Sequence, residues 1–148
     1  MKAHPDDELL QPRHCVANAL QTTARRVGRL YAEALAPTGL TRIQFPILAR
    51  LDARGPLPMT ALAEQLHMDR TTLTRDLAPL ERDGLVERPK DPADGRVRLV
   101  ALTEPGRERL HEARRHWRRA QEQLLELVGR EEWRSLERAL GDLRRRLP

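Results

Sequence analysis

The stretch DPADGRVRLVALTEPG, residues 91–106, limits the fold of this chain more strongly than its other segments do. It opens with Asp-Pro and Asp-Gly pairs, residue types that are typical of turns. From Arg96 to Leu99, charged and apolar residues alternate with the period of a half-buried strand. The pattern predicts a β-hairpin with strands at residues 85–88 and 97–102. A simple helical bundle contains no such hairpin.

Two short helices are predicted directly before this hairpin. Thr60 is a candidate N-cap for ALAEQLH, and Asp69 is a candidate N-cap for the following RTTLTRDLAPLERD. The second helix has an apolar stripe of Leu73, Leu77 and Leu80. Two short helices followed by a hairpin define a winged helix-turn-helix lobe, which we predict over residues 55–102.

Longer helical segments flank this lobe and carry a heptad-like apolar seam. Apolar residues are spaced three and four apart in residues 16–34, 110–127 and 133–147. A winged helix needs only about three helices, so these seams require a second subunit, and a two-fold homodimer is the default. The predicted dimerisation region is residues 10–54 with 103–148, and its seam residues are Val16, Leu20, Trp117, Leu124, Trp133, Leu136, Leu140 and Leu143. The predicted fold class is mainly α with a small β-hairpin.

Composition excludes several classes of protein. The formal net charge is +5, but residues 55–102 hold seven basic and eight acidic side chains, so net charge alone does not predict nucleic-acid binding. The N-terminus lacks the apolar core of a signal peptide, and no apolar run reaches the length of a membrane span. The single cysteine allows no internal disulfide. We expect a soluble, cytoplasmic protein without a membrane partner.

The sequence contains no recognisable catalytic or metal-binding motif. HEARRH, residues 111–116, is close to a zinc motif, but its histidines are five residues apart and lie roughly 140° apart around a helix. They are therefore not expected to share a metal ion. A phosphate-binding loop, a nucleophile elbow and clustered carboxylates are all missing from the sequence. We predict that the protein is not an enzyme and needs neither a metal nor a cofactor.

The segment MTALAEQLHMDRTTLTRDLAPLERDGLVERPKDPADGRVRLVALTEPG resembles the DNA-binding lobe of the MarR family of bacterial transcription regulators. The wing motif D-x-R followed by L-T-x-x-G carries most of the resemblance, and its matching residues are Asp94, Arg96, Leu102, Thr103 and Gly106. GLTRIQFPIL resembles the family's second helix, and the whole resemblance covers residues 14–147. It implies an obligate homodimer with intertwined first, fifth and sixth helices. It also implies a repressor that small aromatic acids or cysteine oxidation release from DNA.

Contacts with double-stranded DNA are predicted on the second short helix, as recognition helix, and on the wing. Two recognition helices about 34 Å apart would face successive major grooves and read a near-palindromic operator. The resemblance places Arg96 in the minor groove, and Asp94 is expected to orient its guanidinium. Arg88, Lys90 and Arg98 either contact phosphates or form a solvated hairpin edge. The candidate DNA-binding residues are Thr60, Arg70, Thr71, Thr72, Thr74, Arg75, Arg88, Lys90, Asp94, Arg96 and Arg98.

Two alternatives stay open at this point. Cys15 lies where peroxide-sensing relatives carry a reactive cysteine, but the only tyrosine, Tyr31, is 16 residues further on, about 24 Å along one helix. Cys15 is thus either a redox sensor or a small structural side chain. The protein is either a repressor with a small aromatic or other small-molecule effector, or an architectural or RNA-binding winged-helix dimer without an effector.

Overall fold

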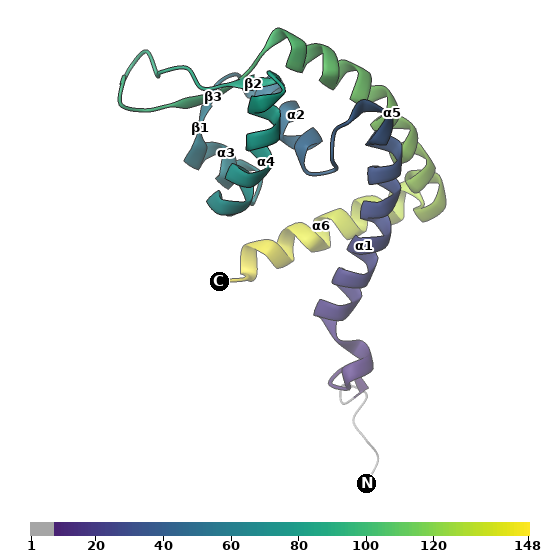
Figure 1. Ribbon diagram of the computed structural model, residues 1–148. Coiled ribbons are helices and arrows are strands. Elements are labelled where there is room, and N and C mark those ends of the chain that lie inside the picture. Colours follow the sequence, from purple (N-terminus) through teal and green to yellow (C-terminus); the bar gives the residue numbers. More distant parts are fainter. Residues whose placement is uncertain (1–7) are drawn as a thin grey trace.

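The computed structural model describes residues 8–148, and its elements follow the predicted order (Figure 1). α1 packs along α5, and the short helices and the sheet lie together beside the first half of α5. The chain is mainly helical with one small sheet, as predicted. Its elements are η2 (Pro12–His14), α1 (Val16–Leu35), η3 (Ala36–Thr38), α2 (Gln44–Arg54), β1 (Leu57–Pro58), α3 (Met59–Gln65), α4 (Arg70–Arg82), β2 (Val86–Glu87), β3 (Leu99–Leu102), α5 (Glu104–Val128) and α6 (Arg130–Arg146).

The sheet confirms the hairpin and adds a third strand that the sequence did not predict. β3 is central in an antiparallel sheet of order β1-β3-β2. Its paired residues are Leu57 with Val100, Pro58 with Leu99, Val86 with Leu102 and Glu87 with Ala101. Both hairpin strands are shorter than predicted, and an isolated bridge joins Lys90 to Arg98 in the wing. A two-residue strand such as β1 has no periodicity, so only its pairing with β3 defines it.

One apolar core joins the short helices to α5. The predicted stripe on α4 is confirmed, because Leu73, Leu77 and Leu80 are each 1% exposed or less. Burying a leucine side chain contributes about 1.5–3 kcal/mol, so α4 is held firmly by this face. α2 contacts α4, β3 and α5, and therefore connects the recognition helix to the long helix. The other large side chains of this core include Ile47, Leu48, Leu51, Leu62, Val100 and Leu110.

The wing is fixed to the start of α5 by Thr103 and Gly106. The Thr103 hydroxyl accepts a hydrogen bond from the Gly106 N–H at 3.1 Å, as an N-cap, and donates to the Gly84 carbonyl at 2.6 Å. A Cβ atom on Gly106 would lie 2.0 Å from the Leu85 carbonyl oxygen, so only glycine fits there. The L-T-x-x-G part of the motif is therefore explained by the junction between the wing and α5.

The start of α3 differs from the prediction. The helix begins at Met59 with Pro58 as its N-cap residue, so Thr60 lies inside the first turn and does not cap it. Pairing of β1 with β3 fixes Pro58 in an extended conformation, and the chain enters the helix directly from that strand. The Thr60 side chain is exposed at this end of the helix.

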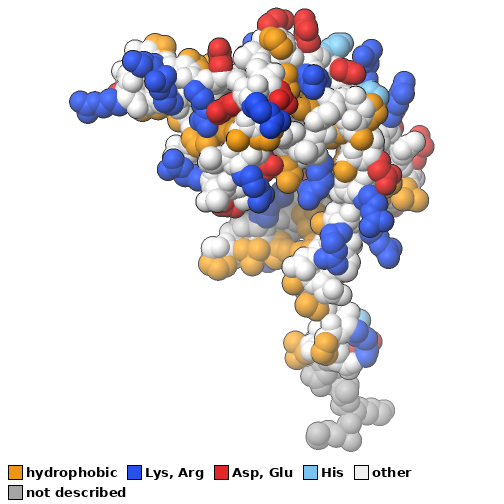
Figure 2. All heavy atoms as spheres, in the orientation of Figure 1, with side chains coloured by type: hydrophobic (Ala, Val, Ile, Leu, Met, Phe, Trp, Pro, Cys, Tyr) orange, Lys and Arg blue, Asp and Glu red, His pale blue; other side chains and the backbone are white. Residues whose placement is uncertain are grey.

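The apolar seams of α1 and α6 are largely exposed in the single chain. Val16, Leu20 and Leu136 have exposed fractions of 62%, 40% and 45%. Figure 2 shows hydrophobic side chains gathered in the lower part of the view, over α6 and the N-terminal end of α1. The other predicted seam residues of α5 and α6 are half-buried, namely Leu124, Trp133, Leu140 and Leu143.

Trp117 has a set of contacts that the sequence did not assign. Its ring stacks on Phe45 of α2, with ring centroids 5.7 Å apart, and on Tyr31 of α1, with centroids 6.4 Å apart. It also packs against the main core of the same chain. Trp117 therefore ties α1, α2 and α5 together, whatever its role between subunits.

Candidate nucleic-acid interface

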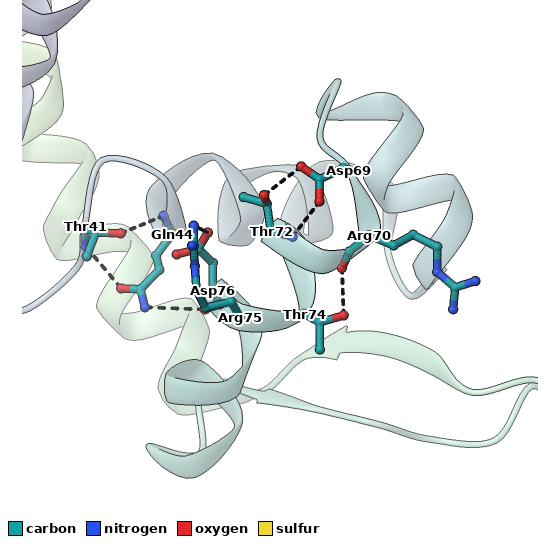
Figure 3. A network of polar contacts seen from close by, with 8 residues as sticks. All are labelled: Thr41, Gln44, Asp69, Arg70, Thr72, Thr74, Arg75 and Asp76. Carbon is teal, nitrogen blue, oxygen red and sulfur yellow. Dashed lines mark hydrogen bonds and ion pairs between the residues drawn. The ribbon is translucent and has the colours of Figure 1, made fainter.

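Asp69 shapes the N-terminus of the recognition helix α4. One carboxylate oxygen accepts a hydrogen bond from the Thr72 backbone N–H at 2.8 Å, and the other accepts from the Thr72 hydroxyl at 2.7 Å (Figure 3). These bonds, the one from the hydroxyl first, lower the pKa of Asp69 below its usual value. The predicted N-cap is confirmed. Because the Thr72 hydroxyl donates its proton to Asp69, this proton is not free to bond a DNA base.

Asp69→Ala should therefore loosen the first turn of α4 and weaken DNA binding, whereas Asp69→Asn should preserve the cap, because both residues cap well. The folded-state pKa of Asp69 is lowered, so its carboxylate contributes fully above the ordinary aspartate pKa. That contribution is lost as the pH falls through the lowered value. The measurement is the difference in melting temperature between wild type and Asp69→Asn across the acid range. A difference that does not change with pH would contradict the assignment.

Four side chains of α4 face solvent beyond this cap. Two arginines and two threonines line a shallow hollow at the start of the helix, namely Arg70, Thr71, Thr74 and Arg75. The Thr74 hydroxyl donates to the Arg70 carbonyl at 2.7 Å, which fixes its rotamer (Figure 3). Arginine can bond guanine through two hydrogen bonds, and threonine offers a hydroxyl and a methyl group to bases. The surface thus carries the chemistry that reads base edges.

α2 supports the recognition helix through a capping box that the sequence analysis missed. Gln44 Oε1 accepts from the Thr41 N–H, and Thr41 Oγ1 accepts from the Gln44 N–H, both at 3.1 Å. The Gln44 side-chain amide also donates to the Asp76 carbonyl of α4 at 3.4 Å (Figure 3). Thr41 and Gln44 have the spacing of a capping box, so the box could have been read from the sequence. The bond to α4 could not.

At the wing tip, Asp94 shapes the backbone instead of holding a guanidinium. Its carboxylate accepts a hydrogen bond from the Arg96 backbone N–H at 3.0 Å, and its carbonyl accepts from the Val97 N–H at 2.9 Å. Within residues 8–148, Asp94 makes no ion pair with the Arg96 guanidinium, so that predicted contact is wrong. The short side chain of an aspartate in a turn readily accepts a hydrogen bond from the backbone N–H two residues later. Arg96 itself is exposed.

Arg88 and Arg98 bond within the protein. The Arg88 guanidinium donates to the Glu81 carboxylate on α4, and its side chain is only 29% exposed. Arg98 Nη1 donates to the Arg88 carbonyl at 3.2 Å. These contacts connect the base of the wing to the C-terminal end of α4. Arg88 thus helps to hold the wing against α4, whereas Arg98 joins the two sides of the wing, and contacts of either with phosphate stay a prediction.

Basic side chains without an ion-pair partner lie at the predicted DNA contact points, although the lobe is nearly neutral overall. Within residues 8–148, Arg70, Lys90 and Arg96 have no ion-pair partner, and the wing carboxylates Asp91 and Asp94 accept only backbone N–H groups. Figure 2 shows Lys and Arg side chains gathered on the wing, at the upper left of the view. These exposed guanidinium and ammonium groups are the ones that can attract an anionic partner.

The described part of the chain offers no sign of a metal site or of a membrane segment. Among residues 8–148, no group of three His, Cys, Asp or Glu side chains could hold a metal ion. No helix in that range is long and apolar enough to cross a membrane.

An exposed helix N-terminus rich in arginine and threonine, beside a basic wing, defines a winged helix-turn-helix DNA-binding protein. Comparison with known proteins refines this class. The MarR family profile matches residues 40–97. The uncharacterized HTH-type transcriptional regulator YxaD of Bacillus subtilis (strain 168) is 32% identical over 137 residues, which cover 92% of each chain. The protein belongs to the MarR family of transcriptional regulators, which agrees with the prediction that it is not an enzyme.

Solved structures of this fold include DNA complexes. The regulator MosR of M. tuberculosis in complex with DNA is 36% identical, with a TM-score of 0.78 over 87% of this chain and 92% of that chain. The repressor CouR bound to a 23-mer DNA duplex is 28% identical, with a TM-score of 0.82 over 97% and 99%. CouR bound to p-coumaroyl-CoA is 29% identical, with a TM-score of 0.82 over 91% and 95%. A second B. subtilis relative, YdgJ, is 32% identical over 107 residues, 65% of its length.

Proposed function

We propose that this regulator is a homodimeric repressor that binds a near-palindromic operator and leaves it when a small anionic molecule binds. The observation that carries the proposal is the pairing of an exposed arginine- and threonine-rich helix start with an unpaired arginine at the wing tip. The exposed apolar seams of α1 and α6 support a second copy of the chain as partner. Sequencing of genomic fragments that the protein selects should yield two inverted half-sites, about 34 Å apart.

A cleft between α1, α2 and α5 supports a small-molecule effector. It has a volume of about 600 Å³, and the row of stacked rings Tyr31, Trp117 and Phe45 forms part of its wall. Such a volume is in the usual range for small-molecule sites. Because α2 supports α4, a ligand that moves α2 would also move the recognition helix.

Two arginines line this cleft and indicate the charge of the ligand. Arg42 and Arg50 both contribute to its wall, and neither has an ion-pair partner within residues 8–148. The Arg42 side chain lies close to Gly28 of α1. A Cβ atom at Gly28 would be only 3.2 Å from the Arg42 Nε. A cleft lined by both guanidinium groups and aromatic rings suits an aromatic or acyl carboxylate. The p-coumaroyl-CoA bound to CouR supports an aromatic acyl group as part of such a ligand.

The redox alternative has less support. Cys15 is exposed and directly precedes α1, while the hydroxyl of Tyr31 donates to Gln121 of α5 in the same chain. The single tyrosine is therefore engaged away from the cysteine. We propose a small molecule rather than an oxidant as the signal.

The effector proposal is tested by titrating benzoate and p-coumarate into the protein on its selected operator. Trp117 fluorescence in a Trp133→Phe background reports binding, and electrophoretic mobility reports release. Arg42→Gln should weaken binding by about tenfold to a hundredfold, since a hydrogen bond to a charged group is worth about 1.5–3 kcal/mol. Arg54→Gln, at the C-terminal end of α2 and outside the cleft, is the control arginine, and Cys15→Ser should respond normally. If neither carboxylate binds at millimolar concentration, the result would support the alternative of a winged-helix dimer without an effector.

A further inference from the structure

A single carboxylate on α2 bridges two arginines of α5. Asp52 Oδ1 accepts a hydrogen bond from Arg107 Nη1 at 3.0 Å, and Oδ2 accepts from Arg114 Nη2 at 2.8 Å. The Asp52 side chain is 22% exposed, and those of the arginines are 51% and 47% exposed. The arginines are seven residues apart, about 10 Å along the helix axis. The carboxylate therefore contacts α5 at two separate turns.

Local helix preferences oppose the charges at both ends of one of these contacts. Asp52 lies in the last turn of α2, where the helix dipole disfavours a negative charge. Arg107 lies at the start of α5, where the dipole disfavours a positive charge. When both charges of an ion pair are unfavourable within their own helices, the contact between the helices is the feature that explains them. Here that contact connects α2 to α5.

The bridge matters for DNA binding because α2 carries the recognition helix. α2 packs on α4 through the apolar core, and the Gln44 amide donates to the Asp76 carbonyl. Leucine contacts are not directional, so they hold α2 on α5 through the fit of their shapes and not through fixed bond directions. The two guanidinium contacts are directional. Movement of α2 along α5 in either direction lengthens one of them.

We propose that Asp52 is a positioning residue that fixes the angle of α4 relative to α5, and through it the half-site spacing that the protein accepts. The first part needs only one chain. The second rests on the homodimer proposed above, in which α5 belongs to the dimer frame. Asp52 itself has no contact with DNA in this scheme.

The angle is measured by the distance between spin labels in a Cys15→Ser background, at the exposed positions Glu64→Cys of α3 and Arg118→Cys of α5. Labelled chain is diluted with unlabelled chain so that distances within one chain dominate. Asp52→Ala should broaden the distance distribution. The matched control is Glu104→Gln, which removes a carboxylate 3.5 Å from the same Arg107 but lies on α5 itself. The control should leave the distribution narrow.

Spacing is measured by binding to the selected operator with one base pair added or removed between the half-sites. For wild type, the altered spacer should lower the affinity for the operator. In Asp52→Ala this loss of affinity should be about threefold to fivefold smaller, and the affinity for a single half-site should be unchanged. If Asp52→Ala folds poorly, the double variant Arg107→Gln/Arg114→Gln should have the same effect. An unchanged label distribution overturns the proposal, and so does an equal loss at every spacer. A chain that sediments as a monomer would refute the proposed homodimer. The distances between the spin labels within one chain would still test the role of Asp52.

Discussion

Replacing Leu136 and Leu140 together by glutamate should leave a monomer that no longer holds its operator. Leu136 is 45% exposed in the single chain and Leu140 is half-buried, both on the apolar face of α6. In the proposed dimer this face is covered by the partner. An unpaired charge placed there costs several kcal/mol per site, which exceeds what the remaining seam can offset. Sedimentation velocity should show the loss of the dimer, and footprinting the loss of protection.

The matched control is Ser135→Glu, which introduces the same side chain on another, exposed face of α6. It should leave both the sedimentation coefficient and the footprint unchanged. Far-UV circular dichroism separates dissociation from unfolding, because the core around α2, α4 and α5 does not include these leucines. A compact wild-type monomer that binds the full operator would refute the dimer directly.

Sequence reasoning succeeded where a feature depends on neighbours along the chain. The N-cap at Asp69 and the apolar stripe on α4 follow from residue type and spacing over a single helix. The wing was also predictable, because turn residues and alternation lie within 20 residues of one another. Family membership followed from the same local motif.

Features that depend on how separate helices and strands pack against one another were not predictable. β1 is a strand only because residues 57–58 meet β3, more than 40 residues further on. Arg88 has the sequence pattern of a phosphate contact, yet its guanidinium meets Glu81 across the turn between α4 and the wing. The cleft and the Asp52 bridge both require the packing of α2 on α5, for which no local pattern exists.

Arg96→Ala should weaken operator binding by about 1–3 kcal/mol and lower the salt slope by about one per half-site. Arg96 is exposed at the wing tip and has no ion-pair partner within residues 8–148, so its guanidinium is free to meet DNA. Arg82→Ala is the control, because Arg82 is an exposed arginine of the same lobe that pairs with Asp83. Titration at several salt concentrations measures both quantities. An unchanged slope for Arg96→Ala would mean that the wing is only a solvated hairpin.

Two substitutions of Asp94 then separate the shape of the wing tip from its charge. The carboxylate accepts a hydrogen bond from the Arg96 N–H, and an asparagine oxygen can accept the same bond without the negative charge. Asp94→Asn should therefore bind the operator as well as wild type or more tightly, because it keeps the turn and removes repulsion from phosphate. Asp94→Ala also removes the charge but loses the turn, so it should bind more weakly. If charge alone governed the wing, both variants would bind more tightly, and equal tightening would show that Asp94 does not position Arg96.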